Sequence, residues 1–179
     1  EYNSIKKSMG FITENRRETG FFHNFDIKEN ISIVPFIKSS KCRGILGFLN
    51  NEVEKEYAVK SKRQLNIKCD SINQNICELS GGNQQKVILS KWMMANSDLM
   101  IFDEPTKGID IGSKSEIYTI IRELSDDGKI IMMVSSELPE LLAVCDKIAV
   151  FKNGRIVDIL PIKEATEEKI MKLLTSEEE

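Results

Sequence analysis

The stretch from Leu99 to Asp110, LMIFDEPTKGID, decides the fold of this chain. Four apolar residues run directly into two adjacent carboxylates, Asp103 and Glu104. A continuous apolar run of this length is typical of a strand that is buried on both faces, as in a parallel sheet. The strand should end before Pro105, because proline cannot donate a hydrogen bond to a sheet ladder. Ligands of open α/β sheets bind at the carboxyl ends of the strands, so the two acids are candidates for chemistry. Taken alone, the pair also fits a strand end with two solvated acids.

Helices and strands alternate after this stretch. Ser113 and Glu116 have capping-box spacing, which predicts the start of an amphipathic helix. After a turn at Asp127-Gly128, the run Ile130–Val134 predicts a second fully apolar strand, parallel to the first through a right-handed crossover. The other elements predicted in this half are a short helix with Leu138, Leu141 and Leu142, a hairpin of KIAVFK and RIVDIL around Asn153-Gly154, and a helix from about Lys163 to Leu174.

The first half of the chain is predicted to be largely helical, after a short buried strand at residues 9–13. The spacing of Asp26 and Glu29 predicts a capping box for a helix that Pro35 disturbs or ends. A connector is predicted at 38–50, and a surface helix from Asn51 to about Ile67 with the thin stripe Val53, Tyr57, Ser61 and Leu65. After an irregular stretch at 66–78, a helix from Asn83 to about Ala95 is predicted to turn Val87, Trp92 and Met94 inward.

The composition excludes several classes of protein. A net charge of −3 gives no global basic field for nucleic acid. No apolar run reaches the roughly 18 residues that span a bilayer, and the start of the chain has no secretory signal. The cysteines (Cys42, Cys69, Cys77 and Cys145) form no CxxC pair and His23 is the one histidine, which disfavours a zinc site and a cysteine–histidine nucleophile. The first residue is not Met, so we expect a piece of a longer chain.

A second informative stretch, LSGGNQQK, lies upstream of the apolar strand, at Leu79 to Lys86. Ser80 is a good helix N-cap residue, and Gly81 and Gly82 leave the backbone amides bare at the helix start. Such a helix terminus attracts anions through its N–H groups and dipole. For SGG alone, a plain helix cap remains the alternative.

The two stretches together resemble the signature sequence and the Walker B and D-loop run of ATP-binding cassette (ABC) proteins. NQQK after SGG, and SSELPE after the next strand, resemble the second cassette of bacterial monosaccharide importers of the ribose, galactose and xylose type. The resemblance implies an α/β, P-loop NTPase-like parallel sheet with a helical subdomain. It divides the chain into a remnant of the core with the Q-loop (1–26), the helical subdomain (27–96) and a RecA-like α/β core (97–179).

The resemblance also implies a role for individual residues. Asp103 corresponds to the aspartate that orders Mg²⁺, and Glu104 to the glutamate that polarises the attacking water. Glu14 falls at the Q-loop position, Asp110 at the D-loop aspartate of the dimer seam, and Ser136 where most cassettes have the switch histidine. The residues implied to contact ATP held by the opposite cassette are Ser80, Gly81 and Gly82, with Asn83 and Gln84 beside them.

The implied function is ATP hydrolysis that energises monosaccharide import, with ATP and Mg²⁺ as cofactors. The implied partners are a second cassette, transmembrane permease subunits and, indirectly, a periplasmic or extracellular sugar-binding protein, with no nucleic acid. The implied location is the cytoplasmic face of the cell membrane. Two alternatives stay open: a soluble ABC protein that is not tied to a membrane, and a non-catalytic interaction module.

One element of the family is absent from the sequence. No GxxxxGK[ST] phosphate loop occurs, since Gly108 to Ser115 has the wrong spacing and residue order. The resemblance implies that this loop precedes residue 1. We therefore expect the isolated chain to bind Mg-ATP weakly or not at all and to have negligible ATPase activity. Isothermal titration of this chain with Mg-ATP tests the expectation, and a micromolar affinity would contradict it.

Overall fold

The computed structural model describes residues 5, 7–38 and 50–175. The chain divides into two compact units, Glu1–Met132 and Met133–Glu179, and each is described by itself. Most of the connector predicted at 38–50, including Cys42, lies outside the described residues.

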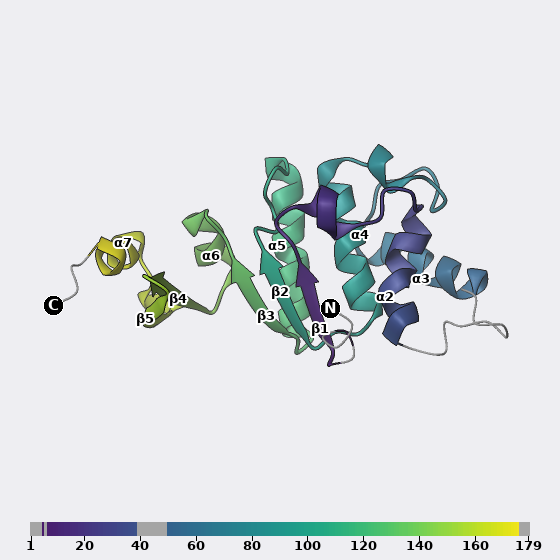
Figure 1. The fold of residues 1–179 in the computed structure, drawn as a ribbon. Helices are drawn as coiled ribbons and strands as arrows, with labels where there is room; N and C mark the ends of the chain where they lie inside the picture. Colours follow the sequence, from purple (N-terminus) through teal and green to yellow (C-terminus); the bar gives the residue numbers. More distant parts are fainter. Residues whose placement is uncertain (1–4, 6, 39–49, 176–179) are drawn as a thin grey trace. The chain divides into compact units, whose positions relative to one another are not determined.

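The first unit is built on a small sheet with the strand order β1-β2-β3 (Figure 1). Its strands are β1 (Met9–Ile12), β2 (Leu99–Asp103) and β3 (Ile130–Val134). Strand β1 runs parallel to β2, with Met9 opposite Leu99 and Ile12 opposite Phe102. The predicted parallel sheet is thereby confirmed for β1 and β2, and β3 lies next to β2 as expected. Strand β2 ends two residues before Pro105, since Glu104 already leaves the ladder.

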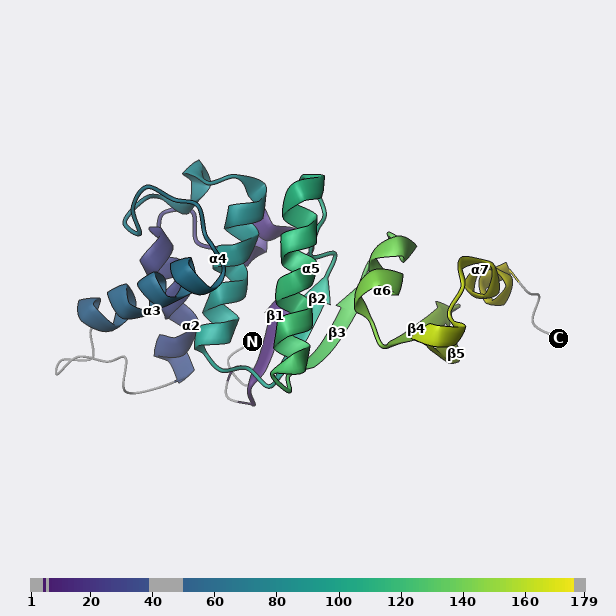
Figure 2. The ribbon, with the colours of Figure 1, turned by 180° about the vertical axis from the view of Figure 1, so that it is seen from behind.

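Helices cover one face of this sheet. Helices α4 (Gly81–Met94) and α5 (Ile111–Asp126) lie on the same side of the strands (Figure 2). On the other face Phe11 is 44%, Ile130 66% and Met132 56% exposed. The second apolar strand forms as predicted but leaves one face exposed in the described part of the chain. Strand β2, predicted to be buried on both faces, is only half-buried at Leu99 and Ile101. An apolar run can bury only as many faces as there are elements to cover them.

The helical part of the first unit holds α2 (Ile27–Lys38) and α3 (Asn51–Gln64), with the short helical turns η1 (Arg16–Gly20) and η3 (Ile76–Glu78). The predicted capping box is confirmed: the Asp26 amide donates to Glu29 at 2.8 Å and the Glu29 amide to Asp26 at 2.9 Å. Pro35 does not end α2, because the residues around it are buried by packing against α3 and α4, and this packing outweighs one missing hydrogen bond.

Helix α3 buries only part of the stripe that the sequence predicts. Ser61 is buried and Leu65, at the C-cap, is 4% exposed, whereas Val53 and Tyr57 are half-buried and Glu54 and Ala58 are buried beside them. The buried Glu54 carboxylate accepts a hydrogen bond from the Ser32 hydroxyl of α2 at 2.9 Å. A satisfied buried carboxylate is tolerated, so α3 packs against α2 through a polar contact as well as through its thin stripe.

The second unit holds α6 (Leu138–Val144), β4 (Lys147–Lys152), β5 (Arg155–Pro161), η4 (Ile162–Glu164) and α7 (Glu167–Thr175). Strands β4 and β5 form the predicted antiparallel hairpin. At its turn Asn153 and Gly154 both have positive φ, 49° and 77°, as a two-residue type I′ turn requires. The core of this unit consists of Ile148, Val150, Leu160, Ala165 and Ile170.

Candidate nucleotide-hydrolysis site

The two adjacent acids lie where β2 ends. Asp103 is the last residue of the strand, and Glu104 follows with φ of +48°, in the left-handed region. A non-glycine residue pays a conformational cost there, and such residues cluster at functional sites. Both side chains are half-buried. The backbone thus turns sharply at Glu104 and presents two neighbouring carboxylates at the strand end.

These two carboxylates fit a magnesium ion that arrives with phosphate groups. Mg²⁺ is commonly held by one or two carboxylates, water and substrate phosphates. Within the described ranges, no group of three or more His, Cys, Asp or Glu side chains could hold a metal by itself. The donor set therefore suits a shared metal–nucleotide site better than a protein-only metal site.

The signature stretch forms the amino end of α4. Ser80 occupies the N-cap position and is exposed, but its side chain makes no capping hydrogen bond. Its hydroxyl instead accepts from the Asn83 amide group at 2.9 Å, and Asn83 Oδ1 accepts from the Lys68 backbone amide at 2.8 Å. Asn83 therefore ties the helix start to the preceding loop, and the Ser80 hydroxyl group does not cap the positive end of the helix.

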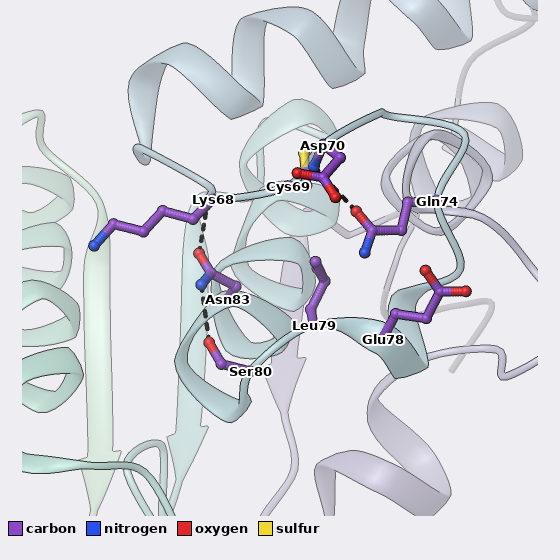
Figure 3. A pocket seen from close by; sticks show the side chains of 8 residues that line it. All are labelled: Lys68, Cys69, Asp70, Gln74, Glu78, Leu79, Ser80 and Asn83. Atoms are coloured by element: carbon purple, nitrogen blue, oxygen red, sulfur yellow. Dashed lines mark hydrogen bonds between the residues drawn. The ribbon is translucent and has the colours of Figure 1, made fainter.

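An open cavity of 480 Å³ borders this helix start (Figure 3). It has mixed polar and charged walls, and Ser80 and Asn83 lie on one side of it, joined by their hydrogen bond (Figure 3). The lining residues are Lys68, Cys69, Asp70, Gln74, Glu78, Leu79, Ser80 and Asn83. The signature serine is thus reachable from solvent.

Gly82 allows the amino ends of α4 and α5 to pack together. A Cβ atom at this position would lie 2.5 Å from both Cβ and Oγ of Ser113. No side chain fits there without displacing α5. The start of the signature helix is therefore fixed against the start of the helix that follows the two acids.

Asp110 is the N-cap residue of α5. Its carboxylate accepts a hydrogen bond from the Ser113 backbone amide at 2.9 Å, and this bond lowers the pKa of Asp110. The prediction that Ser113 caps this helix is wrong, because the helix already begins at Ile111 with Asp110 as its N-cap residue. Glu116 pairs instead with the buried Lys86 ammonium at 2.7 Å, which lowers the pKa of Glu116.

Glu14 lies after β1 and contacts the loop that follows the two acids. Its Oε1 is 2.5 Å from Lys107 Nζ, an exposed ion pair that raises the pKa of Lys107. Arg16 donates to backbone carbonyl groups of the same loop. The sequence alone favours a solvated charged loop for Arg16 and gives no role to Lys107. Because 91 residues separate them, no local pattern could reveal the contact.

Two further site residues were predicted, Gln84 and Ser136. The Gln84 side chain is 3% exposed and donates to the Ile76 carbonyl group at 3.3 Å, so a ligand cannot reach it from solvent in this conformation. Ser136 is exposed and belongs to the second unit. Its neighbour Ser135 donates to the Glu140 carboxylate at 3.0 Å.

His23 and Cys77 lie together on the surface of the first unit. Cys77 Sγ is 3.4 Å from His23 Nδ1, and His23 Nε2 contacts the Arg17 carbonyl group. Both residues are exposed. The pair bridges the loop after β1 and the turn η3 that precedes the signature.

The family model described as ABC transporter matches residues 1–107. The chain belongs to the ABC transporter family. The described residues of this ABC protein contain no helix that is long and apolar enough to cross a membrane.

Several curated relatives of this ABC protein are similar over nearly its whole length. The D-allose import ATP-binding protein AlsA of Escherichia coli is 51% identical over 94% of this chain and 33% of its own length. A putative ribose/galactose/methyl galactoside import ATP-binding protein of Halalkalibacterium halodurans is 43% identical over 98% of this chain and 33% of its own length. The L-arabinose transport ATP-binding protein AraG of Geobacillus stearothermophilus is 45% identical over 96% and 33%. The chain thus spans about a third of the length of these relatives.

Solved structures support the fold. A dimeric ATP-binding cassette in a post-hydrolysis state with ADP and phosphate superimposes with a TM-score of 0.71 at 19% identity, over 86% of this chain and 62% of the other. The α/β cassette fold predicted from the sequence is thereby confirmed.

Proposed function

We propose that the ABC protein that contains this chain hydrolyses ATP to drive import of a monosaccharide. The packing of the signature helix against the helix that follows the two acids carries the proposal, with Gly82 in contact distance of Ser113. This packing holds a phosphate-binding helix start and a metal-binding strand end in one unit. The relatives named above are described as importing or transporting D-allose, ribose or galactose, and L-arabinose, which supports a monosaccharide as cargo over a soluble cassette without a membrane partner.

In this proposal the two acids have separate tasks. Asp103 holds magnesium, which neutralises charge on the phosphate groups of ATP. Glu104 orients the attacking water and accepts its proton. The phosphate loop is not among these 179 residues, so the proposal places it elsewhere in the whole protein.

The signature residues act on a second cassette in this proposal. Ser80, Gly81 and Gly82 offer a hydroxyl group and the backbone amides of the α4 start to the γ-phosphate of ATP that the second cassette holds. Asn83 positions Ser80 through its hydrogen bond. Gln84 is left out, because its side chain is buried.

The remaining predicted residues act at the edges of the site. Glu14 lies beside the loop that follows Asp103 and Glu104, where it pairs with Lys107. Asp110 lies at the seam between cassettes, and the adjacent Ile111 is 87% exposed and available for contact. Ser136 takes the place of a switch histidine, although a hydroxyl group cannot titrate near pH 7 as an imidazole does. We retain the division into 1–26, 27–96 and 97–179, and we propose permease subunits and a sugar-binding protein as further partners at the cytoplasmic membrane face.

ATP hydrolysis by the whole protein in proteoliposomes with its permease tests this function. We expect Mg²⁺-dependent hydrolysis that rises when a monosaccharide-loaded binding protein is added, with D-allose, D-ribose and L-arabinose as probes. Maltose is the control, because a disaccharide should not stimulate. A hydrolysis rate that changes with neither the permease nor the sugar would favour the soluble alternative. Absence of hydrolysis would contradict the proposal.

A further inference from the structure

Arg16 lies where three segments of the first unit meet. Its Nη1 donates to the Lys107 carbonyl group at 3.1 Å and its Nη2 to the Gly108 carbonyl group at 3.2 Å. The side chain is half-buried and starts from the loop after β1. The planar guanidinium group thus donates hydrogen bonds to two consecutive carbonyl groups of the loop that follows Glu104.

The same guanidinium group touches the start of the signature helix. A Cβ atom at Gly81 would lie 2.6 Å from Arg16 Nη2 and 3.5 Å from the Gly108 carbonyl oxygen. The space beside Gly81 is therefore filled by Arg16 and by the carbonyl group that Arg16 binds. Gly108 itself has φ of +67°, so its loop holds a conformation that favours glycine.

A second contact joins two of these segments. The Glu14–Lys107 ion pair links the loop after β1 to the loop after the acids, but its side chains are 50% and 61% exposed. Exposed ion pairs contribute little to stability, whereas hydrogen bonds from a partly buried guanidinium group to backbone carbonyl groups are charge-assisted and directional. The geometric constraint therefore comes mainly from Arg16.

We propose that Arg16 is a positioning residue that couples the loop after Glu104 to the signature helix of the same cassette. The proposal rests on the proposed function, in which Glu104 acts on ATP bound to its own cassette and Ser80–Gly82 act on ATP bound to the second one. Arg16 touches both segments, so a shift of one moves the other. It links the two ATP sites through a single side chain.

Lysine cannot replace arginine in this role. An ammonium group on a flexible stem lacks the planar fork that reaches two carbonyl groups at once. The variant Arg16→Lys keeps the charge and should fold, so it separates geometry from charge. The matched control is Arg17→Ala, which removes a positive charge from the neighbouring, exposed position.

The first test is the hydrolysis kinetics of the whole protein. We expect Arg16→Lys and Arg16→Ala to lower kcat about tenfold or more, since small displacements of catalytic groups are costly. The KM for ATP should stay within about twofold, because Arg16 is not placed on the nucleotide. Arg17→Ala should match the wild type. Unchanged kcat in both Arg16 variants, or a full rescue by lysine, would overturn the proposal.

The second test is a double-mutant cycle on thermal unfolding of the same protein, which needs no ATPase activity. We expect Gly81→Ala to lower Tm in the wild type, because the new methyl group meets Arg16, and to have no such effect in the Arg16→Ala background. Additive shifts would overturn the coupling. If the wild type hydrolyses no ATP, the proposed function fails, and the cycle still decides whether Arg16 couples the two segments.

Discussion

Replacement of Glu104 by glutamine is expected to lower ATP hydrolysis by the whole protein by about 10²–10⁴-fold, the usual contribution of a general base. Glutamine has the size and shape of glutamate but cannot accept a proton from water. Residue 104 has φ of +48°, and glutamate and glutamine both carry an unbranched side chain, so the conformational cost should be the same for both. Loss of the charge, not a change of fold, should cause the effect.

Steady-state hydrolysis and nucleotide binding measured side by side check this result. ATP should still bind to the Glu104→Gln variant, because Asp103 remains to hold magnesium. Glu123→Gln is the matched control, since Glu123 is an exposed carboxylate on α5 in the same unit. Activity of the Glu104 variant within about threefold of the wild type would show that Glu104 is not the general base.

Replacement of Trp92 by alanine is expected to cost about 3–5 kcal/mol of unfolding free energy, the range for deleting a buried aromatic side chain. Trp92 lies on α4 and is 8% exposed. Its ring covers Gly10 of β1, where a Cβ atom would meet Trp92 atoms at 3.2–3.3 Å. The ring therefore fills the space between the signature helix and the sheet, as the sequence predicts for a core residue.

The matched control for this prediction is Trp92→Phe. A phenylalanine ring keeps much of the packing on Gly10, and the lost indole N–H has no hydrogen-bond partner within the described residues. The Phe variant should therefore lose clearly less stability than the Ala variant. Urea unfolding followed by circular dichroism is suitable, because Trp92 is the only tryptophan and its fluorescence disappears with it. A loss below about 1 kcal/mol for Trp92→Ala would contradict the packing role.

The elements with strong local signals could be predicted from the sequence alone. The turn at Asn153-Gly154 and the capping box of Asp26 and Glu29 formed as expected, because each depends on residues a few positions apart. Strand β2 formed for the same reason, since a short apolar run followed by Pro105 leaves few alternatives.

Other features could not be predicted correctly from the sequence, because they depend on which elements pack against them. Pro35 sits inside α2, held by neighbouring helices. Helix α3 also buries Glu54, outside the predicted stripe, where it meets Ser32 across 22 residues of sequence. Strand β2, predicted to be buried on both faces, is only half-buried on one of them. Periodicity reports the average environment of a helix or strand and cannot identify its neighbours.

The sequence by itself determined the family of this chain and the identity of the two acids at the end of LMIFDEPTKGID. Both depend on residue types at fixed local spacing, which the linear order preserves. Only the tertiary structure decided that Arg16 joins Lys107 and Gly108 to the signature helix. It also decided that Gly82 brings two helix starts into contact. These contacts join segments distant in sequence, and they exist because folding places those segments within hydrogen-bond or van der Waals distance.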